Sequence, residues 1–237
     1  MDRTRKFGNK CLVRSVLDAN KCFRTWESDG DRILTKDINS IDRILVEYRK
    51  LNHLTVRVGA LRASNGHSEQ QMEMKAMANE FGVPHITPVH GQWLTIPTKL
   101  AGSQSASQIN GLFKPHGKNV LAKANGNGGL DVYFVLVKQI TIPKRPFLTS
   151  TFTNKFESSW FELAEVNISK IGVGEMTAHE CMADIGRHMA RDVQARIASM
   201  HSPHNAPATV ARKGKDNPLM DTGALYRSIS WTEDLYD

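Results

Sequence analysis

Apolar residues return at the three- and four-residue spacing of an amphipathic helix in two stretches of the first half of the chain. The first starts behind Asp37, a residue type that caps helix N-termini, and its apolar stripe is Ile38, Ile41, Leu45, Tyr48 and Leu51. The second starts at Ser68, three residues before Gln71 as in a capping box, and closes at Gly82. We expect its buried stripe to be Met74, Met77, Ala78 and Phe81.

The same spacing predicts two further helices in the second half of the chain. One covers about residues 154–168, and glycines at positions 172 and 174 interrupt it. A longer helix covers about residues 177–200, and its buried stripe is Met182, Ile185, Met189, Val193 and Ile197. This long helix is the largest single element that the pattern predicts.

Elsewhere apolar and polar residues alternate, as they do in half-buried strands. Residues 54–59 and 225–231 follow this pattern, and residues 93–97 are a candidate edge strand because they end on a proline. Residues 120–124 and 130–140 flank a turn rich in Asn and Gly, which predicts a hairpin. The second strand of that hairpin is apolar on both faces, so we expect it near the middle of a sheet.

Two long polar stretches, 98–119 and 201–218, predict loops that link these elements, the first of them mobile. Together the elements predict an α+β fold, in which an antiparallel or mixed β-sheet packs against the long helix of the C-terminal half and against shorter helices. We expect an N-terminal arm or extension at residues 1–35 and a single domain at residues 36–237. Within that domain, residues 90–130 form an enlarged insertion of loop and hairpin.

The formal net charge of +7 makes an acidic partner or a nucleic acid a candidate ligand. A sequence-specific DNA reader would gather its charge on one recognition helix, and none is evident, so any contact with DNA is expected to be non-specific. The basic residues cluster instead in terminal arms and loops. The candidate interaction residues are Arg3, Arg5, Lys6, Lys10, Lys144, Arg145, Arg212, Lys213 and Lys215.

Candidate metal and redox sites do not meet the spacing that such sites need. The chain has three cysteines, an odd number without paired spacing, so we expect reduced thiols at Cys11, Cys22 and Cys181. Two histidine pairs, His85 with His90 and His201 with His204, have no third ligand at a suitable distance along the chain. The sequence therefore predicts no metal and no cofactor. It also contains no apolar run long enough to cross a bilayer, and we expect no membrane contact and no secretory signal.

No catalytic motif is complete. His179 and Glu180 could open a zinc-protease helix, but Ala183 stands where the second histidine would have to be. The glycine-rich residues 125–129 lie between two predicted strands, whereas a phosphate-binding loop leads from a strand into a helix. We therefore expect that the chain is not an enzyme.

The C-terminal third resembles a signature of phage morphogenesis proteins, which are tail-completion, neck or minor tail components of tailed double-stranded DNA phages. The resemblance rests on residues 205–214 (NAPATVARKG) and 218–229 (PLMDTGALYRSI). Four upstream pieces look similar in the same order: 56–59, 79–82, 142–148 and 185–197. The resemblance covers roughly residues 37–231, and the chain departs from the family pattern at 1–35, at 90–130 and after Trp231.

The resemblance implies a non-catalytic α/β-type subunit, without a cofactor, that assembles as a ring around the DNA channel. The expected partners are copies of itself in a hexamer or dodecamer, the head connector or adaptor, and tail terminator or tail tube proteins. The expected location is the head–tail interface of the virion, after assembly in the host cytoplasm. Two alternatives stay open: a tail terminator or other tail ring protein, and a non-virion DNA-binding protein that uses its basic arms.

Overall fold

The computed structural model describes residues 38–235, which divide into two compact units where the sequence predicted one domain. The described residues of unit 1 are 38–77, 147–198 and 223–235, and those of unit 2 are 78–146 and 199–222. The predicted insertion at 90–130 lies entirely within unit 2. The predicted arm at 1–35 and the predicted cap Asp37 lie outside the described residues.

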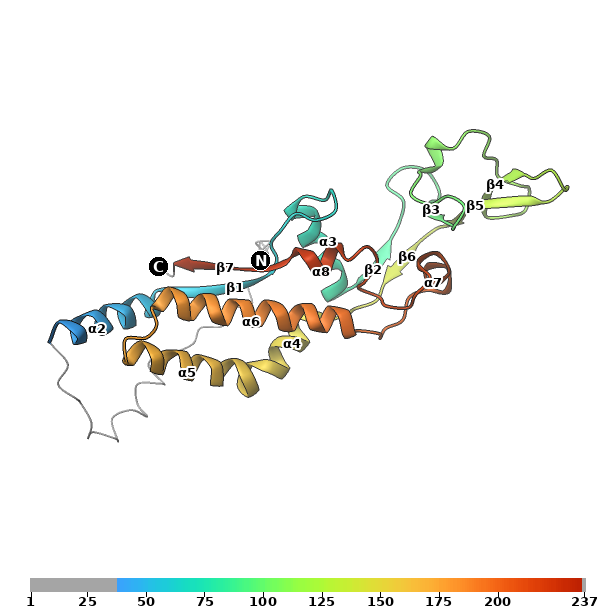
Figure 1. Ribbon diagram of the computed structural model, residues 1–237. Coiled ribbons are helices and arrows are strands. Elements are labelled where there is room, and N and C mark those ends of the chain that lie inside the picture. The colour runs from blue at the N-terminus through green and yellow to red at the C-terminus, as the bar shows by residue number, and fades with distance from the viewer. Residues whose placement is uncertain (1–37, 236–237) are drawn as a thin grey trace, which may run out of the picture. The chain divides into compact units, whose positions relative to one another are not determined.

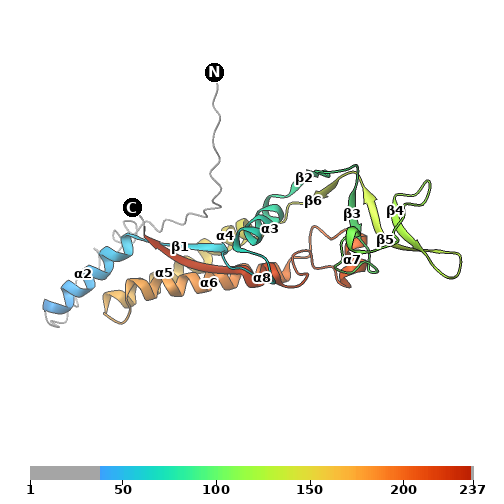
Figure 2. The ribbon, with the colours of Figure 1, turned by 90° about the horizontal axis from the view of Figure 1, so that it is seen from above.

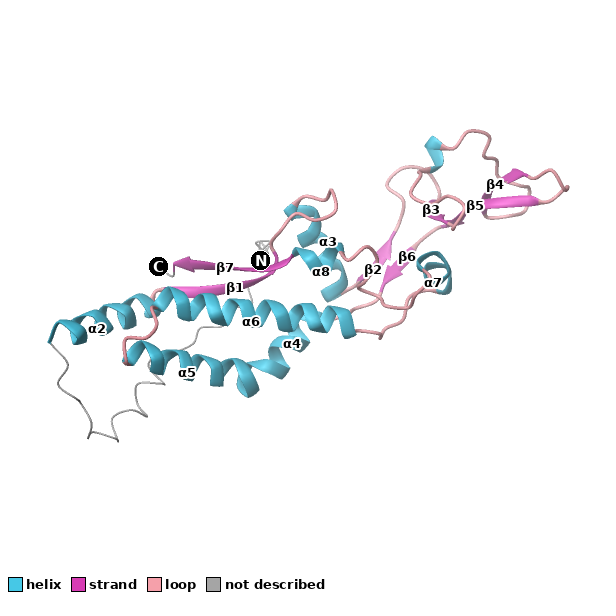
Figure 3. Cartoon of the chain, viewed as in Figure 1, coloured by secondary structure: helices cyan, strands magenta, loops and turns pink. Residues whose placement is uncertain are grey.

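Unit 1 consists of helices packed on a two-stranded antiparallel sheet, as Figure 1 and Figure 3 show. Its helices are α2 (Ile38–Asn52), the larger part of α3 (Glu69–Phe81), α4 (Phe147–Lys155), α5 (Phe161–Gly172), α6 (Ala178–Ser199) and the short α8 (Ala224–Ser228). A π-helical turn, Phe156–Trp160, joins α4 to α5. The strands are β1 (Leu54–Ala60) and β7 (Ile229–Leu235). The α+β class and the long helix of the C-terminal half are therefore confirmed.

The core of unit 1 lies between α6, α5 and the sheet. All five residues of the predicted α6 stripe are buried. Three of them, Met182, Ile185 and Met189, form one core cluster with Leu54 and Val56 of β1 and with Trp160. Strand β7 lies alongside α6 in Figure 1 and Figure 2, and Gly186 marks a close approach between them. A Cβ atom at Gly186 would stand 2.6 Å from ring atoms of Trp231, so only glycine fits there without a shift.

Helix α3 (Glu69–Phe81) begins with the predicted capping box, but its buried face differs from the prediction. The Ser68 amide donates to the Gln71 side chain at 3.0 Å, and the Gln71 amide donates to the Ser68 hydroxyl at 3.3 Å. The buried residues are Met72, Ala76 and Glu80, whereas the predicted Met74 and Phe81 are exposed. The prediction was wrong because the buried face includes a carboxylate, which hides its apolar period.

The expected closing strand at residues 225–231 is a strand only in its second half. Residues 224–228 form α8, which follows Gly223 in a left-handed conformation with φ of 78°. Leu225, Ser228 and Ile229 are buried. Their spacing of three and four residues places them on one face of a helix, but Leu225 and Ile229 would also share one face of a strand. The short run is therefore ambiguous, and the helix forms before the chain enters β7.

Unit 2 contains two small antiparallel sheets. Strands β2 (Val83–Ile86) and β6 (Ile140–Ile142) pair with each other, and the second sheet has the order β3-β5-β4. Its strands are β3 (Leu94–Pro97), β4 (Val120–Ala124) and β5 (Leu130–Val137). The hairpin, the central position of β5 and the edge position of the proline-ended strand all agree with the sequence predictions.

The two predicted loops are more ordered than expected. Residues 98–119 bring Ala101 and Ile109 into a small core with Phe134 of β5, and they include a 3₁₀ turn, η1 (Ala106–Gln108). Residues 201–218 contain helix α7 (Pro207–Lys213), which has a proline in its first turn and ends at Gly214 in a left-handed conformation. Polarity alone predicted loops here because both stretches have few apolar residues.

Candidate functional site

The first candidate surface is apolar and lies in unit 1, on the part of α2 that does not contact the other helices. Within residues 41–51, the predicted α2 stripe is covered at its C-terminal end, where Leu51 is buried and the Tyr48 hydroxyl donates to the Ile168 carbonyl at 3.1 Å. The first turns of α2 extend beyond the turn between α5 and α6 in Figure 1 and Figure 2. Ile41 and Leu45 are therefore 47% and 43% exposed.

Ile41, Leu45 and Val46, together with Leu235 at the end of β7, form a group that we call the α2 surface. Leu235 is 76% exposed, so the α2 surface consists of four large apolar side chains that face solvent. Single exposed apolar residues are common in proteins, but a group beside a cavity is typical of an interaction surface.

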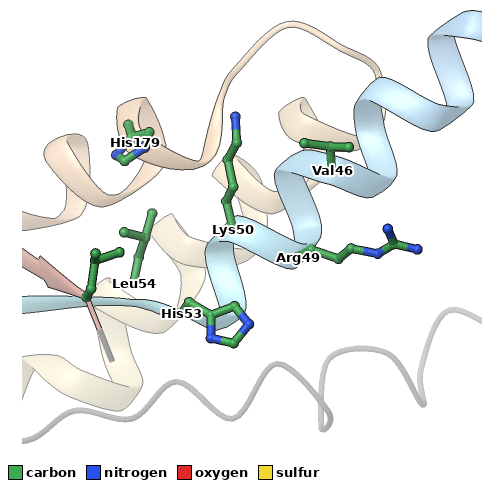
Figure 4. Close-up of a pocket in the computed structure, with 7 residues that line it drawn as sticks. Val46, Arg49, Lys50, His53, Leu54 and His179 are labelled. Atoms are coloured by element: carbon green, nitrogen blue, oxygen red, sulfur yellow. The ribbon is translucent and has the colours of Figure 1, made fainter. Parts of the chain in front are cut away.

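A cavity of about 300 Å³ adjoins the α2 surface. Its lining residues are Val46, Arg49, Lys50, His53, Leu54, His179 and Leu235. Figure 4 shows the side chains of Arg49, Lys50 and His53 diverging from the end of α2. An apolar wall with basic side chains at its rim suits a partner segment that presents an apolar side chain next to carboxylates.

Glu47 fixes the end of α2 against the start of α6. Its carboxylate accepts hydrogen bonds from the Ala178 backbone amide at 2.8 Å and from the Lys50 ammonium at 2.7 Å. The bond from Lys50, followed by the bond from Ala178, lowers the pKa of Glu47. Because a carboxylate also satisfies an otherwise unbonded amide at a helix N-terminus, α2 is held in place at the cavity.

The basic candidates from the sequence come together only in part. Arg3, Arg5, Lys6 and Lys10 lie outside the described residues. In unit 2, Arg145, Arg212 and Lys215 are close enough to Lys213 to act on its charge, and together with burial they lower the pKa of Lys213. Burial is the largest cause of that shift, and Asp221 opposes it.

These unit 2 candidates differ in what they can present to a partner. Lys144 and Lys215 are exposed, and no hydrogen bond or ion pair of either side chain is found among the described residues. Arg212 pairs with Asp221 at 3.4 Å, and the Lys213 ammonium donates to the Asn217 carbonyl at 2.8 Å. Arg145 is only 6% exposed, so it is a structural residue and not the contact residue that its charge suggested.

Arg145 ties the 199–222 segment to the rest of unit 2. Its guanidinium donates to the carbonyls of Pro203 at 3.2 Å and His204 at 3.3 Å, and to the Asn79 side chain at 3.4 Å. Burial lowers the pKa of Arg145, and nearby Asp216 opposes that effect. An arginine keeps its charge even so, because its ordinary pKa is far above neutral pH.

We expect the substitution Arg145→Gln to destabilise the protein by about 1–3 kcal/mol, because it leaves buried acceptors without donors. Chemical denaturation followed by circular dichroism measures this loss. The control is Lys144→Gln, which removes the neighbouring exposed charge and should change stability by less than about 0.5 kcal/mol. Equal effects of the two substitutions would contradict the structural role of Arg145.

A second basic feature, which the local sequence patterns did not indicate, is the sheet β3-β5-β4 of unit 2. The Lys114 ammonium lies 4.7 Å and the Lys138 ammonium 5.8 Å from the centre of the Trp93 ring. Lys123 lies over the ring of Tyr133 at 5.5 Å. A signal was present in the sequence, since residues 81–130 contain no aspartate or glutamate. Counting lysines and arginines in clusters overlooks such a stretch because its lysines are widely spaced.

Several of the residues that could carry chemistry are engaged in structural contacts or buried. His179 pairs with Glu233, and the His204 ring bonds the Asp216 carboxylate at 2.6 Å. Burial is the main cause that raises the pKa of the Cys181 thiol to about 11, so this thiol is a poor nucleophile. Among residues 38–235 no group of three or more metal-ligating side chains is found.

A search of the described helices for one that is long and apolar enough to cross a membrane finds none. Comparisons of the chain with protein-family models, with curated proteins and with solved structures give no match.

Proposed function

We propose that this chain is a structural virion protein of a tailed bacteriophage, a head–tail joining or tail-completion subunit that acts by assembling into a ring. The proposal starts from the sequence resemblance over residues 37–231. The structural observation that supports it best is the α2 surface, where Ile41, Leu45 and Val46 face solvent on a helix whose other end is packed. A subunit that works by packing against copies of itself needs such a surface.

The two-stranded sheet of unit 1 also supports assembly. Among the described residues β1 and β7 pair only with each other, so each strand has one unpaired edge. Unpaired edges of this kind can accept a strand from another chain. The proposed partners are copies of this chain, the head connector or adaptor and the tail terminator or tail tube proteins. The proposed location is the virion, after assembly in the host cytoplasm.

The test is to identify the chain in purified phage particles and to map its neighbours by cross-linking and mass spectrometry. Cross-links to a head connector protein on one side and a tail protein on the other are the expected result. Cross-links to tail tube proteins alone would favour a tail terminator or other tail ring protein. A chain that is synthesised during infection but is missing from intact particles would contradict the proposal.

A further inference from the structure

The charge of the chain is unevenly divided between its two units. Unit 2 has ten lysine or arginine residues and four aspartate or glutamate residues, a net charge of +6. The described residues of unit 1 have twelve basic and thirteen acidic residues, a net charge of −1. The strongly basic character of the described chain is therefore a property of unit 2. A unit with this excess attracts polyanions over distances of about 10 Å at moderate salt.

The sheet β3-β5-β4 presents part of this charge on a rigid support. Lys138 follows β5 and lies opposite Trp93, which precedes β3, and Lys114 approaches the same ring. Lys123 of β4 is held over Tyr133 of β5, and its partner across the β4–β5 ladder is Asp131. Contacts between an ammonium group and an aromatic ring restrict these long side chains, so less conformational entropy is lost when they bind a ligand. We call Lys114, Lys123 and Lys138 the sheet lysines.

The residue types favour a phosphate backbone as the ligand. Eight of the ten basic residues of unit 2 are lysines, which contact phosphates as point charges without reading base edges. The Trp93 ring already has two ammonium groups near it, which would compete with a base of a single strand for the ring. A duplex offers its phosphates at its surface and needs no stacking partner.

We propose that the sheet β3-β5-β4 of unit 2 binds double-stranded DNA, without sequence preference, through phosphate contacts from Lys114, Lys123 and Lys138. This inference goes beyond ring assembly and does not depend on it, because it concerns the surface of one unit of a single chain. It also moves the expected DNA contact away from the N-terminal basic residues that the sequence suggested.

The experiment measures binding of the full-length protein to a fluorescent random-sequence duplex at several salt concentrations. The test variant replaces all three sheet lysines by glutamine. Removing one phosphate contact reduces the steepness of log K against log salt by about 0.9, so we expect a decrease of about 2.7 for three. The variant should also bind at least about tenfold more weakly at low salt. A second variant with arginine at the three positions keeps the charge and should bind as the wild type does.

The matched control replaces three basic residues of unit 1 by glutamine, at Lys155, Lys170 and Arg191. It removes the same charge from the chain and should leave the salt slope within about 0.5 of wild type. Circular dichroism of every variant confirms that the fold is retained. A further variant without residues 1–26 should still bind DNA through the sheet lysines.

Three results would overturn the proposal. The first is that the wild type does not bind the duplex at low salt. The second is that the sheet variant and the unit 1 control lose DNA affinity equally. The third is that binding is lost only when residues 1–26 are removed. Competition by polyglutamate or by single-stranded DNA that is as strong as competition by duplex DNA would also overturn it, since the ligand would then be another polyanion. None of these results bears on whether the chain is found in virions, so the two proposals fail separately.

Discussion

The substitution Leu45→Glu is expected to abolish the self-association that we propose for the chain. Leu45 is the middle residue of the α2 surface and is 43% exposed, so the change is tolerated in the isolated subunit. In an assembled ring the new carboxylate would be buried against apolar side chains of the neighbour, without a partner for its charge. Loss of a central apolar contact together with burial of a charge should weaken each interface by about a hundredfold or more.

Sedimentation velocity over a range of protein concentrations measures this effect directly. The matched control is Val166→Glu on α5, where a similarly exposed apolar residue of the same unit lies outside the α2 surface. The control should assemble as the wild type does, and Leu45→Met should also assemble because it keeps an apolar side chain of similar volume. If Leu45→Glu forms the same oligomer as the wild type, α2 is not the assembly surface.

Local signals in the sequence predicted many of the elements correctly. The capping box at Ser68 and Gln71 forms with both of its hydrogen bonds, and the turn at residues 125–129 joins β4 to β5 as expected. These features depend on residues a few positions apart, which the chain itself displays. The long helix α6 was predicted, and all five residues of its predicted stripe are buried, because 22 residues contain enough repeats to define a period. Its buried face also includes Ala178, Cys181, Gly186 and Ala190.

Features that depend on distant residues were not predicted. Nothing in α3 alone shows that Glu80 is 1% exposed while Met74 is exposed, because burial depends on what the rest of the fold places beside the helix. In the same way the sequence shows that Arg145 is charged, but not that backbone carbonyls of residues 203 and 204 surround it. The division into two units has the same origin, since each unit is built from segments that are far apart in the chain.

The candidate surfaces were predicted less well than the fold. The basic candidates were those with a high local density of charge, and in unit 2 they include a buried arginine and two side chains already bonded to neighbours. The sheet lysines are separated by nine residues or more along the chain, and the fold places Lys114 and Lys138 beside Trp93 and Lys123 beside Tyr133. A scan for long stretches without acidic residues would have identified unit 2 as basic. Net charge over a surface, and not local density of lysine and arginine, is what attracts a polyanion.

The substitution Trp160→Ala is expected to lower the free energy of unfolding by about 3–5 kcal/mol. Trp160 is 5% exposed and stands at the end of the π-helical turn, where its ring contacts that of Phe152 with 5.9 Å between centroids. Its indole Nε1 donates to the Asp192 carboxylate of α6 at 2.7 Å. The change therefore creates a cavity and also removes the donor that joins the turn to α6.

Two further variants separate these contributions in the same denaturation experiment. Trp160→Phe fills most of the volume but has no donor, so a smaller loss of about 1–2 kcal/mol is expected from the missing bond to Asp192. Phe161→Ala truncates the next aromatic residue, which is 38% exposed, and should cost clearly less than Trp160→Ala. If Trp160→Ala and Phe161→Ala lowered the free energy of unfolding equally, Trp160 would not be part of the core of unit 1. If Phe at 160 were as damaging as Ala, the bond to Asp192 would outweigh the packing, because the polar contact alone would then account for the loss.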